Sequence, residues 1–156
     1  MRRPVKNRNM VSPDIKFGSL KLEKFINCIM WDGKKNTARS AVYDALDIVK
    51  EKESVEDPME VFENAIKNAG PLVEVRSRRI GGANYQVPRE VRNERRLALA
   101  MRWIIESARA RKGITIANAL AEEIIQASKG EGNAVKKKKD THKMAESNKA
   151  FAHFAW

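Results

Sequence analysis

Apolar residues recur at helical spacing through most of the 156-residue chain, and this recurrence is what most limits how the chain can fold. Leu22, Phe25, Ile26 and Ile29 follow the spacing of three, four and seven that places side chains on one face of an α-helix. Comparable stripes predict six helices, beginning near residues 19, 36, 57, 93, 115 and 133. We therefore expect a mainly α-helical single domain, because a chain of this length can build one core.

Capping and stop signals place several of the helix ends. Ser19, Asp57 and Thr115 each stand just before an apolar stripe, where their side-chain oxygens can accept a backbone hydrogen bond. Gly70 and the proline that follows it end the third helix. The segment 93–113 is expected to be the longest helix, whereas the last helix has a thin apolar stripe and is expected to pack at the periphery.

Between the third and fourth helices, residues 72–88 follow a strand pattern instead. Val73 and Val75 alternate with charged residues, and Gly81-Gly82 can take the positive φ angles that a tight hairpin turn requires. Apolar residues concentrate near the base of this predicted β-hairpin, with Val87 on the second strand, and are expected to anchor that base on the core. Arginines lie towards its tip. The distal half is therefore expected to leave the body of the protein and contact something negatively charged.

Composition limits the chemical class of the binding partner and the cellular compartment that we expect. Lys and Arg number 31 against 20 Asp and Glu, which gives a net charge of +11 and a pI near 10.0. This excess favours a polyanion, and nucleic acid before a membrane, because no long apolar run is present. The single cysteine, Cys28, excludes an internal disulfide and a multi-thiolate metal site. The first ten residues lack the apolar core of a secretory signal, so an intracellular location is expected.

Charge is distributed unevenly along the chain. Residues 47–63 hold seven acids against two lysines, which predicts one acidic side of the molecule. The first 13 residues are basic, contain few apolar groups, and are expected to form an arm that orders only on binding. Lys34 and Lys35 form a second basic site, and residues 136–139 are an unbroken lysine run.

Three arginines of the fourth helix, Arg95, Arg102 and Arg109, recur every seven residues and therefore lie in one stripe. A solvated helix face would explain such a stripe equally well in a random charged helix. Here few acids neutralise it and it begins at the base of the hairpin, so a surface facing RNA or DNA is the better interpretation.

Catalysis is not indicated, and neither a metal nor a cofactor is predicted. The two histidines, His142 and His153, have no partner at metal-binding spacing, and no serine or cysteine stands in a nucleophile motif. The sequence Asp-Gly-Lys-Lys at 32–35 lacks the glycine spacing of a phosphate-binding loop.

The aromatic residues leave alternatives open. Tyr85 could stack on a base or pack within the hairpin, and the terminal segment 151–156 could also stack on nucleotides. Two functions remain: an RNA-binding structural protein of a large particle, or an architectural DNA-binding protein that uses the basic β-ribbon. Glycines at the ribbon tip disfavour the DNA alternative, because such proteins insert an apolar wedge there.

Four stretches together resemble the bacterial-type family of the seventh protein of the small ribosomal subunit. They are KFINCIMWDGKKNTA, VEVRSRRIGGANYQVPREVR, ALAMRWIIESARARKG and AVKKKKDTHKMAESNKAFAHFAW, in the order and spacing of that family. The resemblance implies a protein of translation that binds small-subunit ribosomal RNA and organises assembly of the head, the 3′ major domain. It also implies contacts with exit-site transfer RNA, with messenger RNA and with the eleventh small-subunit protein, in a cytoplasmic or plastid ribosome.

Patterning and the resemblance together predict an arm, 1–13, and a helical RNA-binding domain, 14–156, with the hairpin at about 72–88 and a basic C-terminal helix and tail from about 133. The expected ribosomal RNA contacts are Arg2, Arg3, Lys6, Arg8, Lys34, Lys35, Arg76, Arg78, Arg79, Arg92, Arg95, Arg96, Arg102, Arg109, Lys136, Lys137 and Lys138. The expected transfer RNA contacts are Gly81, Gly82, Ala83, Asn84 and Tyr85.

Three residues depart from the family pattern. Asn93 stands where proline is usual, Arg89 where a small or apolar residue is common, and Ala155 where many members have arginine. The first two are expected to perturb the exit from the hairpin, and the third to weaken a terminal phosphate contact.

Overall fold

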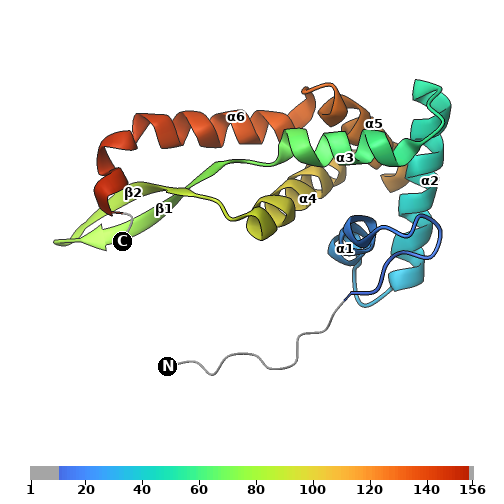
Figure 1. The fold of residues 1–156 in the computed structure, drawn as a ribbon, viewed down its shortest axis with the longest axis horizontal. Coiled ribbons are helices and arrows are strands. Elements are labelled where there is room, and N and C mark those ends of the chain that lie inside the picture. The colour runs from blue at the N-terminus through green and yellow to red at the C-terminus, as the bar shows by residue number, and fades with distance from the viewer. Residues whose placement is uncertain (1–10, 155–156) are drawn as a thin grey trace.

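The computed structural model describes residues 11–154, and it confirms the mainly helical architecture. The elements are α1 (Leu20–Ile29), α2 (Lys35–Glu53), α3 (Pro58–Ala69), β1 (Val73–Ile80), β2 (Ala83–Glu90), α4 (Asn93–Arg109), α5 (Ile116–Ser128), α6 (Gly132–Ser147) and the 3₁₀ helix η1 (Lys149–Phe154). Helices α1 to α5 form the body, and α6 leads away from it alongside the hairpin, so that the hairpin extends to one end (Figure 1).

The predicted caps are present. Ser19 Oγ accepts a hydrogen bond from the Leu22 N–H at 3.4 Å, and Thr115 Oγ1 accepts one from the Asn118 N–H at 3.4 Å. Asp57 Oδ1 accepts from the backbone N–H two residues on at 2.8 Å. These bonds satisfy amide groups that a helix N-terminus otherwise leaves unpaired, so the helix starts follow from the local sequence.

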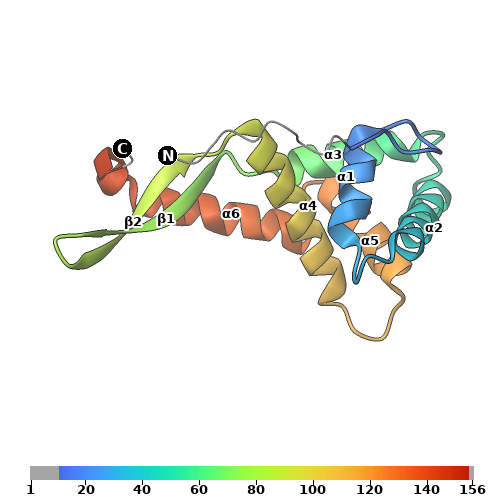
Figure 2. The same cartoon turned by 90° about the horizontal axis from the view of Figure 1, so that it is seen from below.

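Helix α5 lies at the centre of the body, in contact with α2, α3, α4 and α6. Its buried side chains include Leu120 and Ile124, at no more than 1% exposure. Phe25 of α1 and Phe62 of α3 meet edge to face with ring centroids 5.2 Å apart, which is a favourable aromatic geometry. The predicted apolar stripes therefore meet in a single core. Figure 2 shows the helices of the body from below.

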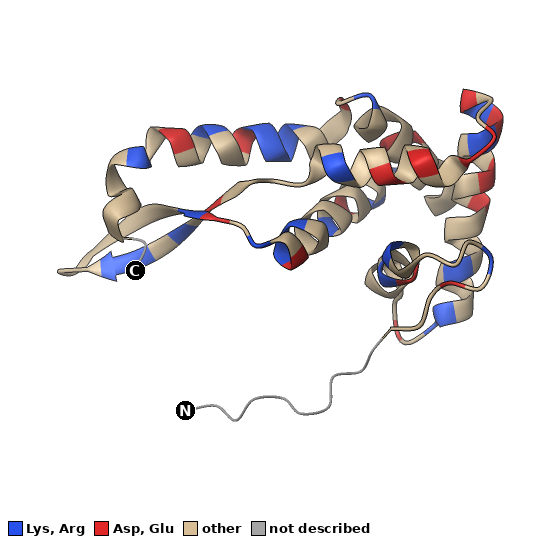
Figure 3. Ribbon diagram, in the orientation of Figure 1, with Lys and Arg blue, Asp and Glu red and all other residues tan. Residues whose placement is uncertain are grey.

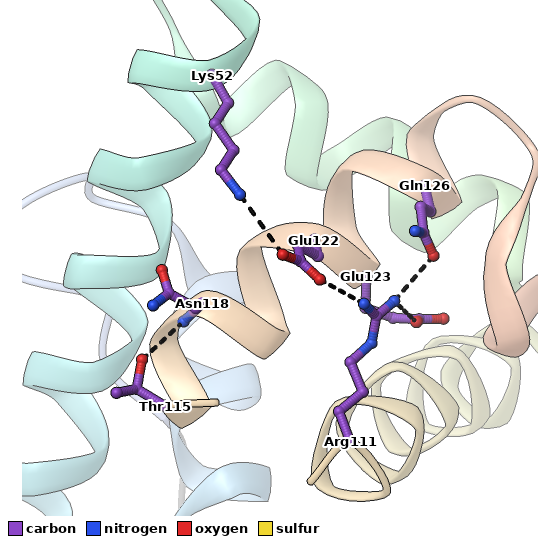
Figure 4. A network of polar contacts seen from close by, with 7 residues as sticks. All are labelled: Lys52, Arg111, Thr115, Asn118, Glu122, Glu123 and Gln126. Carbon is purple, nitrogen blue, oxygen red and sulfur yellow. Dashed lines mark hydrogen bonds and ion pairs between the residues drawn. The ribbon is translucent and has the colours of Figure 1, made fainter. Parts of the chain in front are cut away.

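A polar network around the buried Glu123 joins the loop after α4, α5 and the start of α6, and its contacts with Arg111 are drawn in Figure 4. Glu123 is completely buried, and its carboxylate accepts from Arg111 Nη2 at 3.0 Å and from the Ala134 N–H at 2.9 Å. Arg111 also donates to Glu122 at 2.5 Å and to Gln126 at 2.9 Å. A buried carboxylate held this way orients the start of α6 relative to the loop that follows α4.

One sequence prediction about the helices is wrong: the longest helix is α2, with 19 residues, and α4 has 17. Helix α6 lies at the periphery of the body, as expected, with only Ala134 and Val135 at its start in the core. It also contacts both strands, which the thin apolar stripe did not predict.

The chain enters the body through a turn fixed by Asp14, which is 3% exposed. Its carboxylate accepts from the Tyr43 hydroxyl at 2.7 Å and from the backbone N–H groups of Lys16 and Phe17, both at 3.1 Å. Burial acts to raise the pKa of Asp14, but these hydrogen bonds outweigh it and the pKa is lowered. The segment that follows the predicted arm is therefore firmly attached to α2.

Candidate nucleic-acid interface

The hairpin has the predicted position and turn. β1 and β2 pair antiparallel from Val73 opposite Glu90 to Ile80 opposite Ala83. Gly81 and Gly82 form the connection at φ values of +56° and +91°, which glycine adopts without strain. An added Cβ at either glycine would have no neighbour within 4 Å, so both stand clear of the rest of the described chain.

The hairpin is held by the C-terminal part of the chain, not by the main core. Val87 is 2% exposed and Val73 and Val75 are half-buried, yet none of them belongs to the core cluster. Within residues 11–154, the strands pack on α6 and η1 besides each other, and Glu74 of β1 also pairs with Arg95 of α4. His142 of α6 accepts a hydrogen bond from the Leu72 N–H at 3.0 Å. The prediction that the base of the hairpin rests on the core is thus corrected: it rests on α6.

Tyr85 lies in an aromatic cluster with η1. Its ring centroid is 5.2 Å from that of Phe151 and 5.5 Å from that of Phe154. Across the strand pair it faces Arg78, whose Nη1 donates to the Phe154 carbonyl at 3.1 Å. Of the alternatives for Tyr85, packing is therefore observed, although against η1 and not across the strands. The aromatic residues of 151–154 take part in the same cluster.

A pocket of about 300 Å³ at the base of the hairpin gathers four arginines. We call it the hairpin-base pocket; its charged lining residues are Glu74, Arg76, Arg89, Glu90, Arg92 and Arg95. Glu74 accepts from Arg95 Nε at 2.7 Å and from Arg76 Nε at 3.2 Å. A guanidinium has five N–H donors, so contact through Nε orients both arginines without using the donors of their terminal nitrogens.

The arginine stripe of α4 is less uniform than its sequence spacing predicted. Arg95 is paired with Glu74, whereas Arg102 is exposed. Arg109 Nη2 donates to the Ile29 carbonyl at 2.9 Å. Partial burial raises the pKa of the Cys28 thiol, and the charge of the Arg102 guanidinium opposes that rise. The stripe therefore has two kinds of neighbour, because Arg109 contacts the end of α1 and Arg95 contacts the hairpin.

The lysine run of α6 points in several directions. Lys137 pairs with Glu106 at 2.8 Å, and Lys138 donates to the Asn68 carbonyl at 2.8 Å. Burial, then the charges of Arg96 and Lys139, lower the pKa of Lys138. Lys136 and Lys139 are exposed. The lysine run therefore contributes contacts within the fold as well as exposed charge on the surface.

The remaining predicted residues are also placed. Lys34 is exposed, Lys35 pairs with the buried Glu23, and Arg79 and Arg92 are exposed. Arg96 packs over Gly70, where an added Cβ would lie 2.9 Å from Arg96 Nε. The predictions for Arg2, Arg3, Lys6, Arg8 and Ala155 lie outside the described residues.

Neither departure near the hairpin exit distorts it. β2 continues through Arg89, paired with Glu74, and ends at Glu90. α4 begins at Asn93 with Arg92 in extended conformation before it. Arg89 instead adds a cation to the hairpin-base pocket, a role that its position on a strand did not reveal because the pocket joins residues from three elements.

Charge is polarised along the molecule (Figure 3). Basic residues line the hairpin and α6, whereas acidic residues gather at the far end of α2 and on α3, as the sequence predicted. Within residues 11–154, no group of three potential metal-ligating side chains is present, and no helix is long and apolar enough to cross a membrane. The surface features are those of a polyanion-binding protein.

Sequence reasoning missed one exposed aromatic residue. Trp31, in the loop after α1, is 69% exposed, and its ring centroid lies 5.0 Å from Arg109 Cζ. Helical spacing gave no sign of it, since the residue lies just beyond the helix and its arginine neighbour is 78 positions away in sequence.

Comparison with known proteins gives a consistent match. Residues 1–149 match the model of the family described as Ribosomal protein S7p/S5e. Small ribosomal subunit protein uS7 of Thermotoga petrophila is 54% identical over 156 residues, all of both chains. The protein of the same name from Salinibacter ruber is 58% identical over 142 residues, 91% of this chain and 90% of its own. That from Methylocella silvestris is 54% identical over 155 residues, 99% of each chain.

Proposed function

Because the chain belongs to the Ribosomal protein S7p/S5e family, we propose that it binds small-subunit ribosomal RNA directly and organises assembly of the subunit head. It is a structural component of the small ribosomal subunit, located in the ribosome, and its family is one of structural proteins rather than enzymes. Its partners are accordingly ribosomal RNA and other ribosomal proteins, among which we propose the eleventh small-subunit protein. Membership of this family displaces the alternative of an architectural DNA-binding protein.

The hairpin-base pocket is the observation that supports direct RNA binding. Four arginines and two glutamates line it, which leaves an excess of positive charge beside the hairpin. Arg76 and Arg95 are about half exposed and are oriented by one carboxylate that is 13% exposed. Prepositioned guanidinium groups suit phosphate oxygens, because little side-chain freedom is lost when the contact forms.

Salt titration of full-length protein binding to the 3′ major domain of Thermotoga maritima ribosomal RNA tests this proposal. Replacing Arg76, Arg92, Arg95 and Arg96 with alanine should weaken binding and reduce the magnitude of the log–log salt slope by up to about one per lost contact. Lys50→Ala, which removes an exposed cation at the acidic end, is the matched control and should change neither quantity. Equal slopes for the wild type and the quadruple variant would refute RNA binding by this pocket.

The hairpin tip supports a separate contact with exit-site transfer RNA and the messenger RNA path. Gly81 and Gly82 lack side chains and neighbours, so their backbone can approach a second surface closely. We propose that residues 81–85 make this contact, with Tyr85 contributing mainly by keeping the tip packed on η1.

Deletion of residues 80–84, with the strands rejoined by a short turn, separates the two roles. Reconstituted subunits should incorporate the deleted protein almost normally but retain exit-site transfer RNA less well. The quadruple arginine variant should show the reverse, with incorporation failing first. If the tip deletion blocks incorporation as strongly as the arginine changes, the hairpin has a single role in RNA anchoring.

A further inference from the structure

The loop after α1 holds a tryptophan out into solvent. The Lys34 N–H donates to the Trp31 carbonyl at 2.9 Å, and the two central residues, Asp32 and Gly33, have φ values of 51° and 72°. This tight turn fixes the backbone on which Trp31 stands. Of the Phe, Tyr and Trp residues in the described range, Trp31 alone is exposed. A side chain of this size is usually buried to a large extent, so its exposure requires an explanation.

A cation is fixed over this ring. Arg109 Nη2 donates to the Ile29 carbonyl at 2.9 Å, and the guanidinium carbon lies 5.0 Å from the Trp31 ring centroid. This distance is within cation–π range. Within residues 11–154, Arg109 forms no ion pair with a carboxylate, so the charge beside the ring is not neutralised.

The ring borders a pocket of about 320 Å³ with mainly apolar walls. Ile29, Ala38, Ala41 and Ile116 contribute to these walls, and Lys34 lies on the rim with Arg109. A volume near 300 Å³ is at the lower end for small-molecule sites and suits one planar group. A partner helix would instead need a groove long enough for several apolar anchors.

We propose that Trp31 stacks on an unpaired base of small-subunit ribosomal RNA, and that Arg109 and Lys34 contact the adjoining phosphates. The inference deepens the proposed RNA binding and rests on it. An apolar platform with two cations at its edge matches a nucleotide, whose flat base adjoins a negatively charged backbone. A protein partner of purely apolar surface would leave both cations without a counterpart, and RNA is for that reason the favoured occupant.

The test measures binding of full-length variants to the Thermotoga maritima 3′ major domain RNA. Trp31→Ala should raise the Kd by roughly five- to 100-fold without changing the salt slope, because stacking is not an ionic contact. Trp31→Phe should retain most of the affinity. Lys34→Ala should lower the slope instead. Unchanged circular dichroism of the Trp31 variants is expected, since the side chain is exposed.

A direct signal comes from fluorescence. Trp103→Phe with Trp156→Phe leaves Trp31 as the only tryptophan, and RNA should quench its emission upon stacking. Equal RNA affinity of Trp31→Ala and wild type would overturn the inference. Equal affinity together with poor incorporation into subunits would also overturn it and would assign the pocket to a protein partner. Failure of the wild type itself to bind this RNA better than an unrelated RNA would instead reject the underlying function.

Discussion

The aromatic contact between η1 and β2 should determine how often the hairpin opens. Within the described chain the strands pack only on α6 and η1, apart from the ion pair of Glu74 with Arg95 of α4, and an isolated two-stranded hairpin is marginal in water. Tyr85 makes two ring contacts, with Phe151 and Phe154. At about 0.5–1.5 kcal/mol for each aromatic pair, removing both should cost the hairpin about 1–3 kcal/mol of local stability.

Hydrogen exchange measures this cost directly. Replacing Phe151 and Phe154 with alanine should speed exchange of the β1 and β2 amides by roughly five- to 100-fold, since each 1.4 kcal/mol is a factor of about ten. The Arg78 hydrogen bond to the Phe154 carbonyl involves only the backbone of that residue and is expected to persist. Amides of α5 should be unaffected. Met144→Ala, a truncation of a side chain that is 51% exposed on α6, is the control.

Unchanged strand exchange in the double variant would refute the reasoning, because it would mean that α6 alone holds the hairpin. Faster exchange throughout the body would also refute it, because the contact would then belong to the global fold.

Two further predictions concern stability. Glu123→Ala should lower the free energy of unfolding by about 3–5 kcal/mol, because Arg111 and the Ala134 N–H lose a fully buried partner. Glu122→Ala removes a contact to the same arginine from a partly exposed position and should cost about 1 kcal/mol or less. Urea titration of both variants measures these changes in the free energy of unfolding. The neutral ring of His142 accepts the hydrogen bond from the Leu72 N–H, and burial together with the charges of Lys138 and Arg96 lowers the pKa of this ring. Acidification should therefore weaken the attachment of α6 to the hairpin base. That stabilisation is complete above the ordinary pKa of 6.5 and is lost as pH falls through the lowered value, so His142→Phe should reduce the stability difference between pH 7.5 and 5.5.

Sequence patterns located the elements because helix starts and the hairpin turn depend on neighbouring residues. Ser19, Asp57 and Thr115 cap the helices that they precede, and Gly81-Gly82 forms the turn. The support of the hairpin was not predictable in the same way. It depends on residues about 70 positions apart, such as Leu72 and His142, and no periodic pattern records contacts over that distance.

The interface was predicted as a set of cations, and the structure refines that set. Spacing alone could not show that Lys138 donates to a backbone carbonyl or that Arg95 is oriented by Glu74. It also could not bring Arg89 into a common pocket with Arg76 and Arg92. A charged residue becomes a contact only through its neighbours in space, and for this reason composition predicted the kind of partner better than the individual contacts.

The acidic end of the molecule restricts the orientation in which a polyanion can approach the basic surfaces. Acidic residues at the far end of α2 and on α3 lie at the opposite end of the molecule from the hairpin tip (Figure 3). A polyanion is repelled from that end and attracted along the hairpin and α6, which restricts the orientations in which RNA can approach. The ion pairs within the interface act over a shorter range, since Glu74 orients arginines without cancelling the excess charge of the pocket. We infer that long-range repulsion selects the face of the protein that meets RNA, whereas the partly buried carboxylate of Glu74 sets the geometry of the contact once that face has arrived.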